Sequence, residues 1–216
     1  MDTEFARHQM LVHQVRAFEV NDLLVLDVMS DVARENFVPA GFRNLAFADT
    51  EIPLGHGQRM MTPIVEGRML QSLMITPGDS VLEIGTGSAY ITACLAKLAS
   101  SVYSLDVFDD FLSLAATKLK HAGIANVELA CMDASRELPD GEFNAIAVTA
   151  SLPLFDPRYV SALRPGGRLF VVVGESPVQE ARLIVRNEDS DWTSTALFET
   201  DLPPLVNFPI RNRFRF

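Results

Sequence analysis

The chain has few of the residues on which several classes of protein depend. Its 216 residues include two cysteines, Cys94 and Cys131, both within apolar stretches, so we expect two buried reduced thiols and no disulfide framework. Basic residues are also scarce. There are 18 Lys and Arg against 28 Asp and Glu, a net charge of −10, which disfavours a nucleic-acid partner. The four histidines show no metal-ligand spacing, and we predict no metal site.

Long apolar runs are absent as well. The run from Leu169 to Gly174 is far too short to span a membrane, and the N-terminal residues contain no apolar core of a secretory signal. We therefore expect a cytoplasmic protein without a membrane partner. The length predicts one domain, residues 1–216.

The spacing of apolar residues divides the chain into three regions. Residues 1–75 are mainly helical in pattern, apart from 51–63, where two glycines and two prolines predict a long loop. Residues 76–175 alternate strands with helices, which predicts an α/β fold with a Rossmann-like, doubly wound, mostly parallel sheet. Residues 176–216 change to a strand period, which predicts C-terminal antiparallel edge strands. In the last two regions we expect strands at 80–84, 101–107, 126–132, 143–149, 168–173, 181–186 and 193–199, and helices at 90–98, 110–121 and 159–163.

A glycine loop joins the first predicted strand of the core to its helix. Gly85-Thr86-Gly87-Ser88 follows the strand directly, as expected where backbone approaches a ligand closely. Asp106 ends the next strand about 20 residues on, the place of an acid that binds ribose hydroxyls in such folds. Asp133 and Thr149 end the two strands that follow. Asp133 is alternatively a turn residue, and Thr149 alternatively a hydroxyl that satisfies backbone groups.

The loop also indicates which cofactor fits. A dinucleotide fingerprint has a third glycine where this chain has Tyr90, and no Lys or Arg lies between Gly85 and Ala96 to meet a phosphate. A cofactor with ribose and adenine but no phosphate therefore fits better, and an acidic rim suits a sulfonium cation. These features favour S-adenosyl-L-methionine (SAM) over NAD, which remains the alternative.

The same residues resemble a known family. Val81 to Tyr90 is similar to motif I of class I SAM-dependent methyltransferases, and Leu163 to Leu169 resembles their later strand-entry motif. More of the chain resembles the protein-L-isoaspartate O-methyltransferase family, in segments that extend over nearly the whole length: His13–Arg16, Val25-Leu26, Arg34–Pro39, Ile52–Gln58 as the signature loop, Val148–Ala150, Val173-Gly174 and Gln179.

The resemblance implies methyl transfer from SAM to a carboxylate of an altered aspartyl residue in damaged proteins. It implies a protein or peptide substrate for a single SAM-methyltransferase domain, and we expect a monomer or weak homo-oligomer. Because a carboxylate is already ionised at neutral pH, no strong general base is required, and the enzyme mainly positions the reactants and excludes water. The implied cofactor-binding residues are Gly85, Thr86, Gly87, Ser88, Asp106, Val107, Asp133 and Ala134.

The chain departs from the family pattern near the reacting centre. Met61 stands where the family has a serine that touches this centre, and a thioether cannot donate a hydrogen bond. Thr62, one position later, and Thr149 are the other candidates for catalysis. Arg59 is either a partner for a substrate carboxylate or a solvated loop residue. Ala89 replaces a usual glycine, and Asn144 a usual aspartate. Two alternatives stay open: a methyltransferase for another substrate, and a SAM-binding protein without catalysis.

Overall fold

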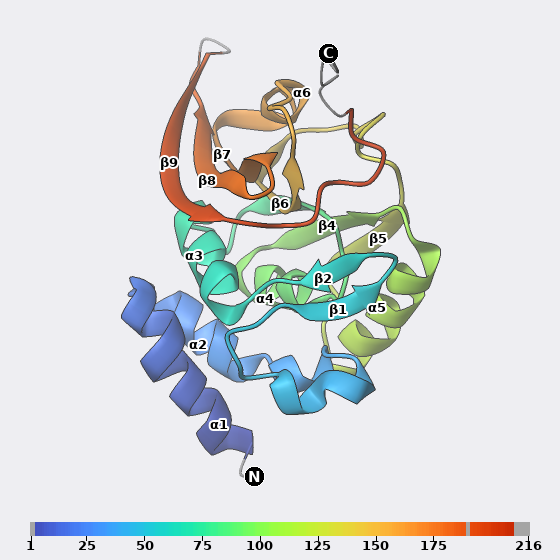
Figure 1. Cartoon of the computed structure of the whole chain (residues 1–216). Coiled ribbons are helices and arrows are strands. Elements are labelled where there is room, and N and C mark those ends of the chain that lie inside the picture. The colour runs from blue at the N-terminus through green and yellow to red at the C-terminus, as the bar shows by residue number, and fades with distance from the viewer. Residues whose placement is uncertain (1–2, 189–190, 210–216) are drawn as a thin grey trace, which may run out of the picture.

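A seven-stranded sheet runs through the centre of the molecule (Figure 1). The computed structural model describes residues 3–188 and 191–209. Five parallel strands are followed by two antiparallel ones, in the spatial order β5-β4-β3-β6-β7-β8-β9. This confirms the predicted fold class. The strands are β3 (Ser80–Ile84), β4 (Ser101–Asp106), β5 (Val127–Cys131), β6 (Phe143–Leu152), β7 (Leu163–Glu175), β8 (Val178–Arg186) and β9 (Trp192–Thr200).

Each face of the sheet has its own hydrophobic core. Alternate residues of β3 illustrate the division, since Val81 belongs to one core and Leu82 to the other, as the period of a strand requires. The first core packs against α3 (Pro63–Leu73), α4 (Tyr90–Leu98), α5 (Asp109–His121) and the N-terminal helices. The second packs against the short α6 (Arg158–Ser161) and neighbouring loops. The central strands are thus buried on both faces, as parallel strands are.

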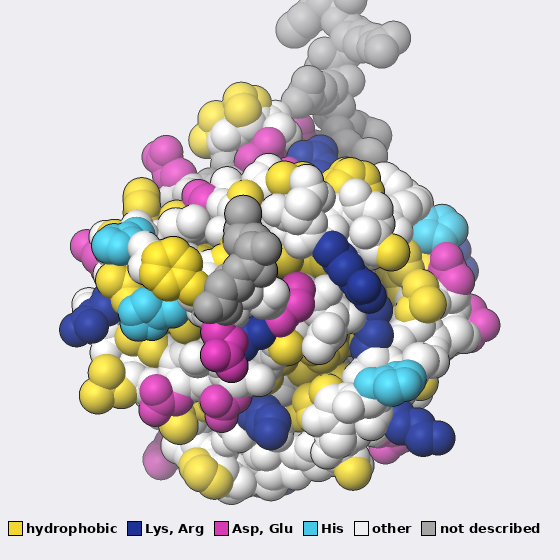
Figure 2. Space-filling view, turned by 90° about the horizontal axis from the view of Figure 1, so that it is seen from below, with side chains coloured by type: hydrophobic (Ala, Val, Ile, Leu, Met, Phe, Trp, Pro, Cys, Tyr) yellow, Lys and Arg dark blue, Asp and Glu magenta, His cyan; other side chains and the backbone are white. Residues whose placement is uncertain are grey.

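The N-terminal region is helical, as predicted. Asp22 begins α2 by accepting hydrogen bonds from the N–H groups of Leu24 and Val25 at 2.9 and 3.3 Å, and this cap satisfies donors that the helix itself leaves free. The region lies against α3 and α4, and the face that it forms is hollowed (Figure 2). Its elements are α1 (Thr3–Met10), η1 (Leu11–Val15), η2 (Arg16–Phe18), α2 (Leu23–Asp31), η3 (Arg34–Asn36) and η4 (Ala40–Leu45).

Residues 51–63 are not a loop, so this prediction was wrong. Ile52–Gly55 (β1) and Gln58–Met60 (β2) pair as an antiparallel hairpin in front of the sheet, with His56 and Gly57 in the turn (Figure 1). Both turn residues have positive φ, 51° and 74°. Such a turn lets two very short strands pair, and the glycine and proline content hid it.

Three further expectations need correction. Strand β7 begins at Leu163 rather than 168, and includes Pro165-Gly166-Gly167, because Leu163 pairs with Phe143 before a register shift. Strand β6 continues to Leu152, so Thr149 lies within the strand rather than at its end. Cys94 is buried as predicted, but Cys131 is exposed because β5 is an edge strand. Residues 210–216 of the predicted C-terminal region lie outside the described residues.

No helix among the described residues is both long enough and apolar enough to cross a membrane.

One buried guanidinium connects the N-terminal region to the rest of the molecule. Arg34 is fully buried and forms a two-point ion pair with Glu66 of α3, at 2.9 and 3.1 Å. It also donates to the carbonyl oxygens of Ala46 (2.5 Å) and Met61 (2.8 Å), and it lies over the ring of Tyr90. Arg34 therefore contacts three segments that are distant from it in sequence: those of Ala46, of Met61 and Glu66, and of Tyr90.

We expect Arg34→Met to lower the free energy of unfolding by about 3–5 kcal/mol, because the Glu66 carboxylate is left buried without a partner. Arg182→Met breaks the half-buried pair of Arg182 with Glu180, which is far more accessible than that of Arg34, and should cost less than about 1 kcal/mol. Urea unfolding measures both. The double variant Arg34→Met/Glu66→Leu should recover most of the loss, and a double variant as unstable as Arg34→Met alone would contradict this explanation.

Candidate functional site

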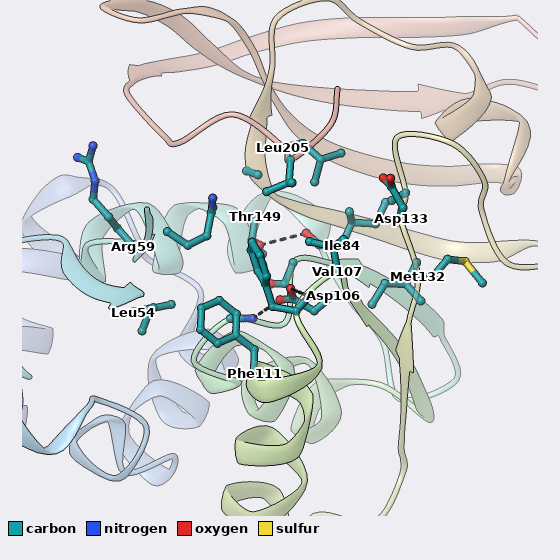
Figure 3. Close-up of a pocket in the computed structure, with 18 residues that line it drawn as sticks. Leu54, Arg59, Ile84, Asp106, Val107, Phe111, Met132, Asp133, Thr149 and Leu205 are labelled. Carbon is teal, nitrogen blue, oxygen red and sulfur yellow. Dashed lines mark hydrogen bonds between the residues drawn. The ribbon is translucent and has the colours of Figure 1, made fainter. Parts of the chain in front are cut away.

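The glycine loop lies where the strand order of the sheet reverses. Strand β3 has β4 on one side and β6 on the other, so the loop after β3 opens into the crevice between their carboxyl ends (Figure 3). Gly85 has a φ of +99°, and a Cβ there would lie 2.3 Å from Oγ1 of Thr149. Gly87 has a φ of +48°, and its Cβ would lie 3.2 Å from Leu54. Only glycine fits at position 85 without displacing β6.

Thr149 holds this loop against the sheet. Its hydroxyl lies 3.0 Å from the carbonyl oxygen of Ile84 and 2.7 Å from that of Gly85, and it has a single proton to donate between them. The alternative interpretation of Thr149, a hydroxyl that satisfies backbone groups, is therefore the one that the structure supports. The side chain also lines the cleft.

Asp106 holds the loop from the other side. One carboxylate oxygen accepts from the N–H of Gly87 (2.9 Å), and the other from the N–H of Phe108 (3.0 Å). Burial raises the pKa of Asp106, while the hydrogen bonds from Gly87 and Phe108 oppose that rise. A carboxylate has about four acceptor positions, so Asp106 can accept further hydrogen bonds from a ligand in the cleft. In Figure 3 it lies centrally, between Phe111 and Val107.

The structure brings most of the predicted cofactor-binding residues to one cleft. The cleft contains about 580 Å³ of empty space, counting the part open to solvent. The predicted residues that line it are Gly85, Gly87, Asp106, Val107, Asp133, Ala134 and Thr149.

Thr86 and Ser88 do not line this cleft. The hydroxyl of Thr86 is buried and lies 2.7 Å from that of Ser104, and the hydroxyl of Ser88 accepts from the N–H of Tyr90 at the start of α4. Their side chains therefore stabilise the loop.

Asp133 lines the cleft, but its carboxylate is largely engaged elsewhere. One oxygen accepts from both the N–H (3.1 Å) and the hydroxyl (2.6 Å) of Ser135, and the other from Asn207 (2.9 Å) and Arg136. The alternative interpretation as a turn residue is therefore realised.

Sequence reasoning missed several apolar residues of the cleft. Phe108 and Phe111 come from the start of α5, and Leu205 and Val206 from the chain after β9. The segment after β9 returns to this edge because Ser151 of β6 pairs with Pro204 as a parallel bridge. Two phenylalanines just after Asp106 were a usable signal, whereas nothing local to Leu205 indicates a contact with the cleft.

The β1–β2 hairpin closes one side of the cleft. The imidazole of His56 stacks on Phe108, with centroids 4.1 Å apart and the planes 9° apart, and lies 3.0 Å from a carboxylate oxygen of Asp110. Leu54, Gln58 and Arg59 contribute lining residues. The hairpin thus covers the loop that Asp106 and Thr149 hold.

The three residues of the divergent segment are separated by the fold. Met61 is buried and lines a smaller cavity of about 310 Å³ under the glycine loop. Thr62 lines neither cavity, and its hydroxyl caps α3 by accepting from the N–H of Val65 at 3.5 Å. Arg59 lines both cavities, is about half exposed, and pairs with Glu51 at 2.6 Å. Of the three, only Arg59 offers a polar side chain to both cavities.

Glu83 lies in the wall of the smaller cavity and was not predicted. It is fully buried; one oxygen accepts from Thr92 and from Ser104, both at 2.6 Å, and the other has no partner. Burial raises the pKa of Glu83 to about 8, so the carboxyl is mainly protonated at neutral pH. No cluster of His, Cys, Asp and Glu side chains suited to a metal occurs in the described part of the chain.

Comparisons with known proteins agree on one family. The family model described as protein-L-isoaspartate(D-aspartate) O-methyltransferase matches residues 6–208. A protein-L-isoaspartate O-methyltransferase of Koribacter versatilis is 35% identical over 201 residues, which cover 93% of this chain and 90% of the relative. Protein-L-isoaspartate O-methyltransferase 1 of Rhodopseudomonas palustris is 38% identical over 208 residues, covering 94% and 85%.

A solved structure shares the fold over nearly the whole chain. It is described as a protein-L-isoaspartate O-methyltransferase from Plasmodium falciparum in complex with S-adenosyl-L-homocysteine. The TM-score is 0.81 at 21% identity, and the match covers 92% of this chain and 98% of that one. The central sheet and the antiparallel strands at its C-terminal edge therefore form a known arrangement.

The raised pKa of Glu83 makes a prediction about pH. Its pKa is about 8 in the folded chain against 4.5 for an ordinary glutamate, so the fold binds the proton more tightly than the unfolded chain does. This contribution to stability is present below about pH 4.5 and is lost as the pH rises to 8, at roughly 1.4 kcal/mol per pKa unit. In Glu83→Gln, which cannot ionise, the free energy of unfolding should fall less between pH 5 and 9 than in the wild type.

The exposed variant Glu128→Gln serves as the control and should follow the wild-type curve. Denaturant unfolding at a series of pH values measures all three proteins. Parallel curves for Glu83→Gln and the wild type would show that Glu83 is already ionised in the fold.

Proposed function

The chain belongs to the protein-L-isoaspartate O-methyltransferase family, and from this membership we propose that it methylates a carboxylate of isoaspartyl residues in damaged proteins. It is a SAM-dependent methyltransferase. The observation that carries the proposal is the glycine loop at the point where the strand order reverses, with Asp106 beside it and no phosphate partner on it. A protein or peptide is the proposed substrate. Several expectations stay predictions: a single domain, a monomer or weak homo-oligomer, a cytoplasmic location, and the absence of nucleic-acid and membrane partners.

The cleft fits SAM better than a cofactor with phosphates. Arg59 is the single Lys or Arg among the described residues that line it, and it lies on the β1–β2 hairpin rather than on the glycine loop. Asp106 has acceptor positions left for ribose hydroxyls, and Val107 and Met132 offer apolar surface for an adenine ring. We therefore propose that Gly85, Gly87, Asp106, Val107 and Ala134 contact SAM, that Asp133 lies beside it, and that Thr86 and Ser88 act by holding the loop.

The reaction requires little acid–base chemistry from the protein. SAM, when bound, supplies an electrophilic methyl group. The substrate carboxylate is ionised at neutral pH, so the residues of the site need to orient it and keep water away rather than remove a proton. The hairpin that covers the cleft and the phenylalanines at the start of α5 supply the apolar surroundings.

We propose that Arg59 orients the substrate carboxylate in place of the family serine. Met61 has no donor, Thr62 lines neither cavity, and the hydroxyl proton of Thr149 is directed to backbone carbonyls. Arg59 is a lining residue of both cavities, and its guanidinium, which Figure 3 draws directed away from Asp106, has N–H donors beyond its pair with Glu51. A guanidinium matches the geometry of a carboxylate with two parallel hydrogen bonds.

The cofactor assignment predicts that Asp106→Ala weakens SAM binding by about tenfold to a hundredfold, the worth of a hydrogen bond to a charged group. Isothermal titration calorimetry measures the affinity, and circular dichroism at the same temperature checks that the variant is folded. Asp109→Ala removes an exposed acid at the start of α5 and should bind SAM as the wild type does. Equal affinities for Asp106→Ala and the wild type would exclude the proposed ribose contact.

The substrate assignment predicts methylation of an isoaspartyl peptide, but not of the aspartyl peptide with the same sequence. Transfer of labelled methyl groups measures the activity. Arg59→Gln should raise KM for the isoaspartyl peptide about tenfold with a smaller effect on kcat, because the contact forms when substrate binds. Arg164→Gln removes another exposed arginine, one that does not line the cleft, and is the charge-matched control.

Two results would overturn parts of this assignment. SAM binding without methylation of the isoaspartyl peptide, while a family enzyme is active in parallel, would favour the alternatives of another substrate or lost catalysis. If Met61→Ser then gains activity on the peptide, the scaffold fits isoaspartyl substrates and residue 61 alone prevents the reaction. An unchanged KM in Arg59→Gln would exclude Arg59 as the carboxylate partner.

A further inference from the structure

A second pocket lies at the C-terminal ends of α4 and α5, whereas the hairpin contacts the start of α5. It opens between these helices and the N-terminal region, and contains about 1000 Å³ of empty space, counting the part open to solvent. Figure 2 views this face, where Lys, Arg and His side chains border a hollow with apolar side chains inside it. The mechanism proposed above uses none of the residues that line it.

The pocket gathers basic side chains that have no acidic partner among residues 3–188 and 191–209. Arg43, Lys97, Lys118 and His121 line it, and Asp31 is the one acidic residue that does so. Most other arginines in the described part of the chain are in ion pairs with Asp or Glu. The chain has three lysines in all, and two of them are in this pocket. In a protein with a net charge of −10, this is a local excess of positive charge.

Lys118 forms the inner end of this cationic group. Its half-buried ammonium donates to the carbonyl oxygens of Phe37 (2.7 Å) and Ser88 (3.1 Å), and has a third N–H to offer. Desolvation lowers the pKa of Lys118, and no carboxylate opposes that effect. An anion beside the ammonium would supply an opposite charge that stabilises it. Since Ser88 belongs to the glycine loop, one side chain connects this pocket to the cofactor site.

Part of the pocket wall is apolar and keeps exposed surface. Ala33 and Ile124 are partly exposed and Ala122 is exposed, whereas Val32 and Phe37 are already buried. A bare inorganic ion would leave these walls uncovered, whereas a small molecule with a ring or hydrocarbon part would bury them.

We propose that this pocket binds a small organic anion, whose phosphate or carboxylate group contacts Arg43, Lys97 and Lys118 and whose apolar part packs on Ala33, Ala122 and Ile124. Guanidinium and ammonium groups together suit either oxyanion. Asp31 and His121 also line this pocket. Because the Asp31 carboxylate repels an anion, the ligand needs a full negative charge for its attraction to the basic side chains to outweigh that repulsion.

Phenyl phosphate is a probe with both features. At pH 8, where a histidine is normally neutral, we expect isothermal titration calorimetry to show saturable binding to one site. Arg43→Gln/Lys97→Gln should weaken it at least about tenfold, because two charge-assisted contacts are lost. Both side chains are exposed, so the variant should keep the wild-type melting temperature. Lys120→Gln, which removes an exposed lysine outside the pocket, should change the affinity less than about twofold.

Three outcomes would overturn the proposal. Binding that does not saturate by about 10 mM excludes a site for this class of ligand. An equal loss in Lys120→Gln shows attraction to the general charge of α5 rather than to the pocket. If inorganic phosphate binds as tightly as phenyl phosphate, the apolar walls contribute nothing to the affinity, and the proposed organic ligand is excluded. Because no SAM is present in the titration, failure here is distinct from failure of the methyltransferase assignment.

Discussion

The buried guanidinium of Arg34 is the contact on which the arrangement of the functional half depends. Removing a charge from water is costly, and it is tolerated only when each donor has a partner. For Arg34 these partners are Glu66 on α3, the carbonyl of Ala46 after η4 and the carbonyl of Met61 after β2. The N-terminal helices, the end of the hairpin and α3 must therefore take their places together. The hairpin that covers the cleft is fixed at its base by this requirement.

At the glycine loop, too, the same side chains stabilise the fold and form the site. Asp106 and Thr149 come from β4 and β6, the neighbours of β3, and each holds the loop through hydrogen bonds to its backbone. A parallel sheet brings these parts of neighbouring strands together at one edge, so residues far apart in sequence meet there. The acceptor positions that Asp106 does not use on the loop remain for a ligand. The site thus follows from the sheet topology.

Sequence patterns predicted β3, its glycine loop and α4 because the signals there are local: an apolar strand, glycines that permit close approach, and a helix period. Asp106 followed from spacing. The hairpin at 51–63 was missed because its strands are very short and stabilised by tertiary contacts such as that of His56 with Phe108. The early start of β7 depends on pairing of Leu163 with Phe143, and Leu205 reaches the cleft through a bridge to β6. Both are non-local pairings. The burial of Glu83, likewise, is a property of the packed sheet.

The backbone around Met61 is held in place by its neighbours. The carbonyl of Met61 is fixed by Arg34, and the next residue, Thr62, caps α3, so the backbone on both sides of the side chain is constrained. A different side chain at position 61 therefore changes what faces the smaller cavity without requiring a shift of the hairpin. A methionine there offers no hydrogen-bond donor to the smaller cavity. Arg59 lies two residues away and lines the same cavity, and a charged guanidinium favours an ionised carboxylate more strongly than a hydroxyl does. Methionine at 61 is thus compatible with a carboxylate acceptor, provided that the arginine at 59 is present.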